Sequence, residues 1–515
     1  MSQKLLLYIA AFMLITLVTC SHSQQKQAAD MPSHLPDNNH APKTTNPASI
    51  PVALKQLIDQ LNRDAVLRHG SWALSVQDVT SGRQLVQVNP YQTMTVASSL
   101  KTVTTSAGLG ILGSNYKFAT QIQYDGALNG GVINGNVYIK GGGDPTLGSP
   151  LLGYSLDRTM NEWIAAMKKA GIRRIKGQLI IDETLFEENV TPSSWIWADM
   201  GNYYAAPAGA INVLDNTYKL YLQPANRLNT TPKVLRTSPW VPRIQFVNHL
   251  KTAAAGTGDQ AYIHGAPYDH VRYINGTIPM GSTFSIKGAL PDPGFYLGIA
   301  FRKKLIQNGL MTNKNKATTT RMMKLDKQRI NYRRTLVYTH RSTTLKSLVK
   351  WINLYSINLY AEAVLKAIGI KQQAEGSTAA GAKAITQYWK AKGLSTSGLY
   401  IEDGSGLAQS NGITAYQLAQ VQRLTAKQSY FNDYYQSLPV AGVSGTMRGL
   451  CRGTRAQNNL RAKTGGMTRV ISFTGYFKNR AGQLRSFALV ANQYTCKYNI
   501  IKAKLARLMV AMVEV

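Results

Sequence analysis

The stretch SSLKTVTTSAGLGIL, residues 98–112, places Ser98 and Lys101 three residues apart at the start of an expected helix. Two further motifs follow it along the chain. The triplet SIN (356–358) lies on or beside a second expected helix, and the triplet KTG (463–465) opens an expected strand. The order and the structural context of the three motifs are the main evidence for the fold and the function.

The Ser-x-x-Lys pattern alone is weakly specific, because it also occurs at Ser23, Ser114 and Ser347. Ser23 falls in a polar segment, Ser114 follows a glycine where a helix should end, and Ser347 is explained as an ordinary helical residue. Each motif taken alone has a structural explanation, such as a serine that caps a helix. Taken together and in this order, they favour a catalytic site.

The residue types suit nucleophilic catalysis. A serine hydroxyl needs a neighbouring base, and three residues along a helix place Lys101 on the same face as Ser98. Burial and nearby cations lower a lysine pKa toward neutrality, so Lys101 can accept the proton. Ser356 can relay that proton to a leaving amine, and Asn358 can hold a peptide amide of the substrate. Lys463 supplies positive charge for a terminal carboxylate.

The three ordered motifs resemble those of penicillin-binding proteins and serine β-lactamases. Four other stretches resemble the class C low-molecular-mass penicillin-binding proteins, the D-alanyl-D-alanine carboxypeptidase/endopeptidases of peptidase family S13. They are YIKGGGDPTLG (138–148), WIWADMGNYYAAPAGAINVLDN (195–216), EDGSGLAQSNGIT (402–414) and LPVAGVSGTMRGL (438–450). The resemblance runs from about Ile50 to the C-terminus.

The resemblance implies an α/β (α+β) serine transpeptidase/β-lactamase-like domain with a long β-rich insertion that forms two small extra domains. It implies cleavage of D-alanyl bonds in peptidoglycan stem peptides through an acyl-enzyme on Ser98, with β-lactams as inhibitors. The backbone N–H groups of Ser98 and Gly466 would stabilise the oxyanion. The implied catalytic residues are Ser98, Lys101 and Ser356, and the implied substrate-binding residues are Asn358, Lys463, Thr464, Gly465, Gly466, Asp199 and Gln409.

Four positions depart from the family pattern. Ala198 precedes Asp199 where some members have two acids, and Gln409 replaces an arginine. Gly466 stands where a hydroxyl residue would meet the substrate carboxylate, and Arg469 replaces a glycine. In the family, the acid and the arginine help to bind the charged end of a diaminopimelate stem. We therefore expect a relaxed preference for the stem side chain.

The N-terminus has the pattern of an export signal. Lys4 precedes an apolar run from Leu5 to Val18, which is shorter than a membrane span and ends in small or polar residues. An uncleaved membrane anchor and lipidation at Cys20 are the alternatives. The expected divisions are a signal peptide at 1–22, a polar linker at 23–49, a catalytic domain at 50–114 and 320–515, and inserted β-rich domains at 115–319. Export to the periplasm follows.

The formal charge of +33 indicates either an anionic partner or general solubility. Export argues against nucleic acid, so peripheral contact with an anionic envelope surface is the functional interpretation. The eight histidines show no metal-binding spacing, and neither a metal nor another cofactor is expected. Cys451 and Cys496 flank the strands that begin near Lys463, and an oxidising compartment predicts a disulfide between them.

Periodicity predicts the remaining elements. Apolar spacing predicts a helix in VALKQLIDQL (52–61), and a hairpin surrounds the turn TSG (80–82). Residues 115–300 read as short strands. Helical spacing returns at 345–368 and 413–424, two strands follow near 460–466 and 483–494, and a terminal helix at 499–513 is expected to pack on a sheet.

Two other functions remain open beside the peptidase. A β-lactamase shares the three motifs but is not expected to carry the inserted stretches. A basic wall-binding protein whose site acylates without turning over would fit the four departures. Turnover of a pentapeptide and hydrolysis of a penicillin separate the three.

Overall fold

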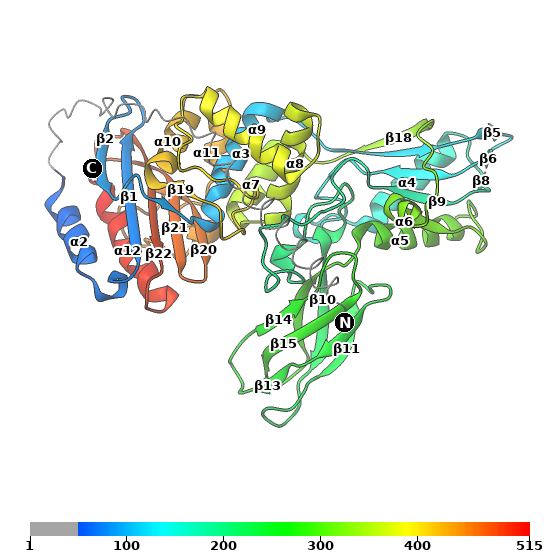
Figure 1. The fold of residues 1–515 in the computed structure, drawn as a ribbon, viewed down its shortest axis with the longest axis horizontal. Helices are drawn as coiled ribbons and strands as arrows, with labels where there is room; N and C mark the ends of the chain where they lie inside the picture. The colour runs from blue at the N-terminus through cyan, green and yellow to red at the C-terminus, as the bar shows by residue number, and fades with distance from the viewer. Residues whose placement is uncertain (1–49) are drawn as a thin grey trace, which may run out of the picture. The chain divides into compact units, whose positions relative to one another are not determined.

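The computed structural model describes residues 50–515, and segments from both ends of this range build one antiparallel sheet, the main sheet. Its strand order is β2-β1-β22-β21-β20. The strands are β1 (Ser71–Asp78), β2 (Gln84–Val88), β20 (Arg461–Met467), β21 (Val470–Lys478) and β22 (Leu484–Asn492). Strand β1 pairs with β22 from Ser71 opposite Asn492 to Asp78 opposite Arg485. The N-terminal hairpin therefore lies against strands from the other end of the chain (Figure 1).

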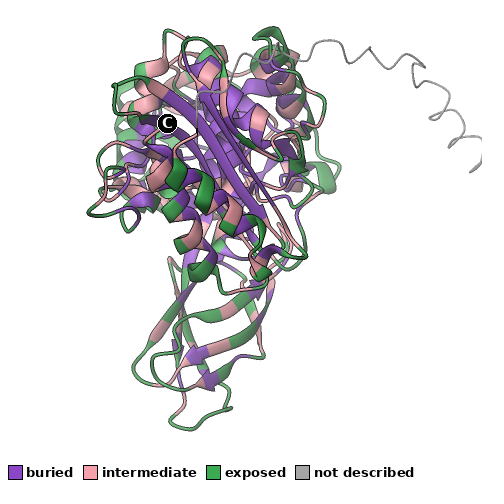
Figure 2. Cartoon of the chain, turned by 90° about the vertical axis from the view of Figure 1, so that its left-hand side faces the viewer, coloured by how far each residue is buried: buried purple, intermediate pink, exposed green. Residues whose placement is uncertain are grey.

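Both faces of the main sheet are buried (Figure 2). Along β1, Trp72 and Leu74 belong to one apolar cluster and Ala73 to another, as expected when successive side chains point to opposite faces. Helices α2 (Val52–Asn62) and α12 (Tyr498–Met512) complete the cluster of Trp72. The predicted packing of the terminal helix on a sheet is confirmed.

Strand β21 was not predicted, although part of its sequence alternates. In VISFTGYFK, Ile471 and Phe473 alternate with Ser472 and Thr474, and all positions except the last are buried. Gly475 interrupts this short pattern, and glycine is unfavourable in the interior of a strand. The flanking strands β20 and β22 were predicted, and both pair with β21.

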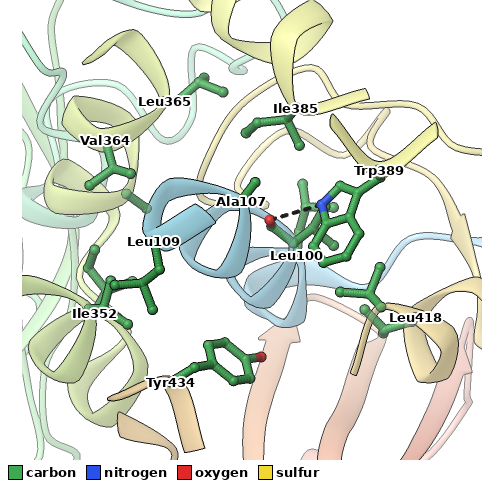
Figure 3. Packing of buried hydrophobic residues seen from close by; sticks show 14 of the residues in the cluster. Leu100, Ala107, Leu109, Ile352, Val364, Leu365, Ile385, Trp389, Leu418 and Tyr434 are labelled. Atoms are coloured by element: carbon green, nitrogen blue, oxygen red, sulfur yellow. Dashed lines mark hydrogen bonds between the residues drawn. The ribbon is translucent and has the colours of Figure 1, made fainter. Parts of the chain in front are cut away.

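Helices cover the second face of the main sheet, and α3 lies at their centre (Figure 3). They are α3 (Lys101–Leu112), α7 (Leu345–Tyr355), α8 (Asn358–Gln373), α9 (Thr378–Ala391), α10 (Ala415–Thr425) and α11 (Phe431–Ser437). A single 3-10 turn, Ala97–Leu100, leads into α3, so Ser98 precedes the regular helix and Lys101 begins it. Beside this turn, the short strands β3 (Thr93–Met94) and β19 (Ile413–Thr414) pair with each other.

The helix expected over 345–368 is two helices. Ser356 ends α7 with φ 61° and ψ 39°, and α8 begins at Asn358. The apolar spacing continues through this break, and no glycine or proline marks it, so periodicity does not detect it. The break sets Ser356 in a left-handed conformation, which is costly for a residue with a Cβ and is often found at functional positions.

Residues 115–341 form four further sheets. Their orders are β17-β9-β7-β4-β18, β5-β6-β8, β11-β10-β16 and β12-β15-β13, with β14 paired to β15. The strands are β4 (Ala119–Tyr124), β5 (Ala127–Asn129), β6 (Val132–Asn134), β7 (Val137–Lys140), β8 (Arg174–Ile175), β9 (Leu179–Asp182), β10 (Thr217–Gln223), β11 (Lys233–Ser238), β12 (Gln245–Asn248), β13 (Lys251–Ala253), β14 (Gln260–His264), β15 (Val271–Pro279), β16 (Phe284–Ala289), β17 (Ala317–Thr319) and β18 (Thr335–Arg341).

This region also contains the helices α4 (Leu156–Lys169), α5 (Pro293–Gln307) and α6 (Thr320–Leu325). Only strands were expected over residues 115–300, so α4 and the first part of α5 correct that expectation. Helix α4 begins at a Ser155 cap and buries Trp163 against Phe301 of α5, with ring centroids 5.3 Å apart. Helical apolar spacing in α4 was present in the sequence, but the surrounding turn residues and short strands concealed it.

The predicted disulfide is wrong, because Cys451 and Cys496 are free thiols. Cys451 is buried, and its Sγ lies 3.9 Å from the carbonyl oxygen of Ala506 in α12. Burial raises the pKa of this thiol to about 11. A disulfide requires two Cβ atoms within about 3.5–4.5 Å. Proximity of both cysteines to the same strands did not determine the directions of their side chains.

The predicted signal peptide, the linker and Cys20 lie outside the described residues. Within residues 50–515, none of the helices has both the length and the apolarity needed to cross a membrane.

Trp389 of α9 links this helix to α3 and provides a test of the packing. Its side chain is fully buried, and Nε1 donates a hydrogen bond to the carbonyl oxygen of Val103, 3.2 Å away (Figure 3). Trp389→Phe should lower the free energy of unfolding by about 1–3 kcal/mol, because the smaller ring leaves a void in the core and one buried hydrogen bond is lost. Urea denaturation measures this. The control, Trp240→Phe, changes a residue that is 69% exposed and should shift the value by less than about 0.5 kcal/mol. Equal effects would contradict the packing.

Candidate active site

The amine of Lys101 is buried at the centre of the site. Its Nζ lies 2.9 Å from Ser98 Oγ and donates to Asn358 Oδ1 and to the carbonyl oxygen of Ser405, both at 2.5 Å. Burial is the largest influence on its pKa and lowers it, while the charges of Asp403 and other nearby acids oppose this effect. The resulting pKa is about 7. Near neutral pH, a large share of this amine is therefore unprotonated.

A second lysine and serine lie beside the first pair. Lys463 Nζ donates to Ser356 Oγ at 3.0 Å and to the carbonyl oxygen of Thr464 at 2.6 Å. Burial, followed by the charge of Lys101, lowers the pKa of Lys463 well below its usual range. The two amines therefore compete for protonation, and an anion bound near Lys463 would favour its charged form.

Asn358 joins this cluster to the WIWADMGNYY stretch. Its Nδ2 donates to the carbonyl oxygen of Tyr204 at 2.7 Å. The hydroxyl of Tyr204 in turn donates to Asp199 Oδ1 at 3.0 Å. Burial raises the pKa of Asp199, and the hydrogen bond from Tyr204 partly offsets this. Asp199 therefore connects to the cluster through Tyr204.

Asp403 holds the loop that supplies the Ser405 carbonyl, and sequence reasoning did not assign it a role. Its buried carboxylate accepts hydrogen bonds from Trp195 Nε1 at 2.8 Å and from the backbone N–H groups of Gly406, Leu407 and Ala408 at 2.7–2.9 Å. The signal was present in EDGSGLAQSNGIT, where Asp403 directly precedes a run of turn residues. Such an acid commonly organises its own loop.

Glu362 of α8 was also missed. Its carboxylate accepts from the backbone N–H of Gly404, and burial together with the charge of Asp403 raises its pKa to about 7. A glutamate inside an apolar helix was visible in LYAEAVLKAI. Its proximity to the loop depended on how α8 packs.

Gly465 allows strand β20 to approach the turn that carries Ser98. A Cβ at this position would lie 2.2 Å from the carbonyl oxygen of Val96 and 2.3 Å from Ser472 Oγ. Both distances are far below van der Waals contact, so no other residue fits without movement of the backbone. Glycine in the Lys-Thr-Gly triplet therefore has a steric role here.

Three of the positions that depart from the family pattern, Gln409, Gly466 and Arg469, lie at the surface. The Gln409 side chain is exposed, and Thr95 Oγ1 donates a hydrogen bond to the backbone carbonyl oxygen of Gln409. Gly466 is exposed on β20 next to Tyr498. Arg469 is exposed in the β20–β21 turn with φ 57°, a left-handed conformation that favours glycine. The conformation explains why glycine is usual at that position in the family pattern.

Comparisons with known proteins agree with the family that the three ordered motifs resemble. Residues 54–511 match the model of the D-Ala-D-Ala carboxypeptidase 3 (S13) family. The D-alanyl-D-alanine carboxypeptidase of Actinomadura sp. (strain R39) is 25% identical over 454 residues, which cover 86% of this chain and 81% of that protein. The D-alanyl-D-alanine carboxypeptidase DacB of Haemophilus influenzae is 24% identical over 428 residues, or 81% of this chain and 85% of that protein.

The fold is similar to that of penicillin binding protein 4 from Haemophilus influenzae. That crystal structure has a TM-score of 0.75 and 21% sequence identity, and the match covers 89% of this chain and 98% of that chain. The likeness confirms the α/β fold with extra β-rich sheets. Because the family model spans nearly all of the described residues, the chain belongs to the D-Ala-D-Ala carboxypeptidase 3 (S13) family of serine hydrolases.

Proposed function

We propose that this D-Ala-D-Ala carboxypeptidase cleaves D-alanyl bonds of peptidoglycan stem peptides through an ester on Ser98, with Lys101 as the base. The observation that carries the proposal is the environment of Lys101 Nζ. Two of its three neighbours, Asn358 Oδ1 and the Ser405 carbonyl, can only accept hydrogen bonds. A neutral amine has two N–H groups for these acceptors. Its lone pair then faces the third neighbour, the Ser98 hydroxyl.

The proposed reaction follows from these contacts. The Ser98 proton passes to Lys101 as Oγ bonds to the substrate carbonyl carbon, and the backbone N–H groups of Ser98 and Gly466 donate to the oxyanion. The C–N bond then breaks, and the proton on Lys101 passes through Ser356 to the leaving amine. Water attacks the ester, releases the acid and returns the proton to Ser98 Oγ.

Lys463 and its neighbours would hold the substrate's terminal carboxylate. Lys463 is buried and its pKa is lowered, so an arriving carboxylate would restore its charge by direct attraction. Thr464 and Gly465 would border the bound peptide along β20. Asn358 keeps one Nδ2 hydrogen for a substrate amide, because the Tyr204 carbonyl uses the other. Asp199 and Gln409 would contact the stem side chain.

We also propose that the catalytic domain comprises 50–114 and 320–515, interrupted by inserted domains at 115–319. Strands from both ends of residues 50–515 share the main sheet, which supports an insertion. Strand β18 (Thr335–Arg341) pairs with β4 of the inserted region, so we propose that the second boundary moves from residue 320 to about residue 342.

The proposed site of action is the periplasm, after export through the N-terminal signal. Stem peptides would be the substrates and β-lactams the inhibitors. A structure of the Haemophilus relative was determined in complex with a β-lactam, which supports β-lactam binding here. The formal charge of +33 would favour peripheral contact with an anionic envelope surface.

Penicillin labelling tests the nucleophile. Wild-type protein should gain the mass of one penicillin, and Ser98→Ala should gain none, because the hydroxyl that forms the ester is absent. Intact-protein mass spectrometry with peptide mapping measures both. The control, Ser347→Ala, changes another Ser-x-x-Lys serine, which pairs with Thr344, and should label normally. Label on Ser98→Ala would show that another residue is acylated. Rapid loss of the label with hydrolysed penicillin, and no release of D-Ala, would identify a β-lactamase instead.

The pH dependence of acylation tests the base. Protonated Lys101 cannot accept a proton, so the second-order rate constant for penicillin should rise with pH below about 7 and level off above it. Lys101→Ala should lower this constant by at least about a hundredfold and remove the rise near pH 7. Stopped-flow measurements from pH 5 to pH 9 provide the profiles. Lys346→Ala, at an exposed lysine of α7, is the control. An unchanged profile in Lys101→Ala would exclude this lysine as the base.

The four departures predict weak discrimination at the stem side chain. Wild-type kcat/KM should differ by less than about a hundredfold between a D-Ala-D-Ala peptide with a free diaminopimelyl end and its acetylated analogue. Gln409→Arg should increase the preference by roughly tenfold or more, because it restores a charge-assisted contact. Release of D-Ala is measured for both peptides. A larger wild-type preference would show that another residue, such as Asp199, binds the charged end.

A further inference from the structure

A large cleft adjoins the part of the proposed site that would hold the leaving fragment of the substrate. Its volume is about 560 Å³, and it lies between residues 355–359, at the α7–α8 break, and the sheet β11-β10-β16. Ser356 and Asn358 contribute to its wall. A single D-alanine is much smaller than this volume, so the cleft can hold a larger leaving fragment.

The far wall of the cleft carries two lysines that face the same space. Lys219 of β10 and Lys287 of β16 are directly opposite each other in the antiparallel register, and both are exposed and line the cleft. Like charges placed directly opposite on neighbouring strands destabilise a sheet. None of the ion pairs formed within residues 50–515 includes either lysine. A bound anion would relieve this repulsion.

The acid in the cleft wall does not neutralise these lysines. Asp215 accepts hydrogen bonds from the hydroxyls of Ser149 and Tyr360 and from the backbone N–H of Leu151. These contacts direct its carboxylate toward the protein. The charge offered to a ligand in the cleft is therefore positive.

Exposed aromatic rings provide the other surface of the cleft. Tyr203 is 53% exposed and Tyr355 is 56% exposed, and both line the cleft. Lys287 Nζ lies 5.8 Å from the centre of the Tyr203 ring. Tyrosine rings offer flat apolar contact to peptide groups, while the lysines favour carboxylates. The wall therefore suits a peptide with free carboxylates.

The position of Ser356 determines which part of the substrate occupies the cleft. In the proposed reaction this serine passes the proton to the leaving amine, so the leaving fragment lies beside it. We propose that the cleft binds the departing stem peptide of a cross-link. The carboxylate beside the scissile bond stays with Lys463, and the other carboxylates of the departing stem lie on Lys219 and Lys287. The inference rests on the proposed function, and it makes these two lysines specificity-determining residues for cleavage of cross-links over release of single D-alanine.

Paired substitutions test the cleft. Lys219→Gln/Lys287→Gln should lower kcat/KM for a cross-linked muropeptide dimer by about tenfold or more, because two charged contacts are lost. Release of D-Ala from a pentapeptide and acylation by penicillin should stay within about twofold, because neither requires the cleft. The control, Lys233→Gln/Lys251→Gln, removes the same charge from exposed lysines outside the cleft wall and should leave all three rates unchanged.

A modified substrate gives an independent measurement on the wild-type protein. A dimer whose departing stem has all carboxylates amidated except the one beside the scissile bond, which Lys463 would hold, should be cleaved about tenfold or more slowly than the free acid. The amidated dimer should then be insensitive to the Lys219→Gln/Lys287→Gln change. Cleavage of both dimers at the same rate would overturn the proposed contact.

The other outcomes separate the cleft from the function. Unchanged dimer cleavage in Lys219→Gln/Lys287→Gln, or an equal loss for all three reactions, would overturn the assignment of the cleft. Wild-type protein that releases D-Ala but leaves dimers intact would also overturn it, while the proposed peptidase function would stand. Wild-type protein that neither releases D-Ala nor forms a penicillin adduct would contradict the function itself.

Discussion

The rest of the site depends on the contacts of the buried Lys101 amine. Three segments far apart in the chain converge on it, namely the turn of Ser98, the start of α8 at Asn358 and the loop of Ser405. Two of these segments have their own support, because Gly465 lets β20 approach the Ser98 turn and Asp403 fixes the Ser405 loop. The packing of helices around α3 therefore serves to hold one amine away from water. A shift in any segment would either rehydrate the amine or move it from the hydroxyl.

This arrangement opposes stability. Lys101 has a pKa of about 7 in the folded protein and near 10.4 when unfolded, so the unfolded chain binds more protons between those values. The resulting penalty is absent above about pH 10, grows as the pH falls and is complete below about pH 7. Lys463 adds a second penalty of the same sign. Asp403 and Glu362 limit the effect on Lys101 by favouring its charged form, which keeps the pKa near neutrality. Catalytic sites often carry such a cost.

Much of the local structure was predictable because it follows local rules. Helix α2 and the β1–β2 hairpin matched their apolar periods and turn residues. Strand β21 and the break at Ser356 were not predicted, since Gly475 interrupts the alternation of β21 and a left-handed serine leaves no compositional mark. The predicted disulfide was also wrong, because two cysteines that flank the same strands in the sequence need not lie within bonding distance in the folded protein.

The sequence by itself indicated which groups we propose as the reacting groups. The order of the serine-lysine pair, the Ser-x-Asn triplet and the Lys-Thr-Gly triplet was enough to indicate the family and the chemistry. Only the tertiary structure decided the burial that lowers the pKa of Lys101, the contacts of Asp403 and Glu362, and the cleft lined by Ser356, Lys219 and Lys287. The physical reason is that desolvation and charge interactions depend on distances between segments hundreds of residues apart, whereas a motif is defined by neighbours along the chain.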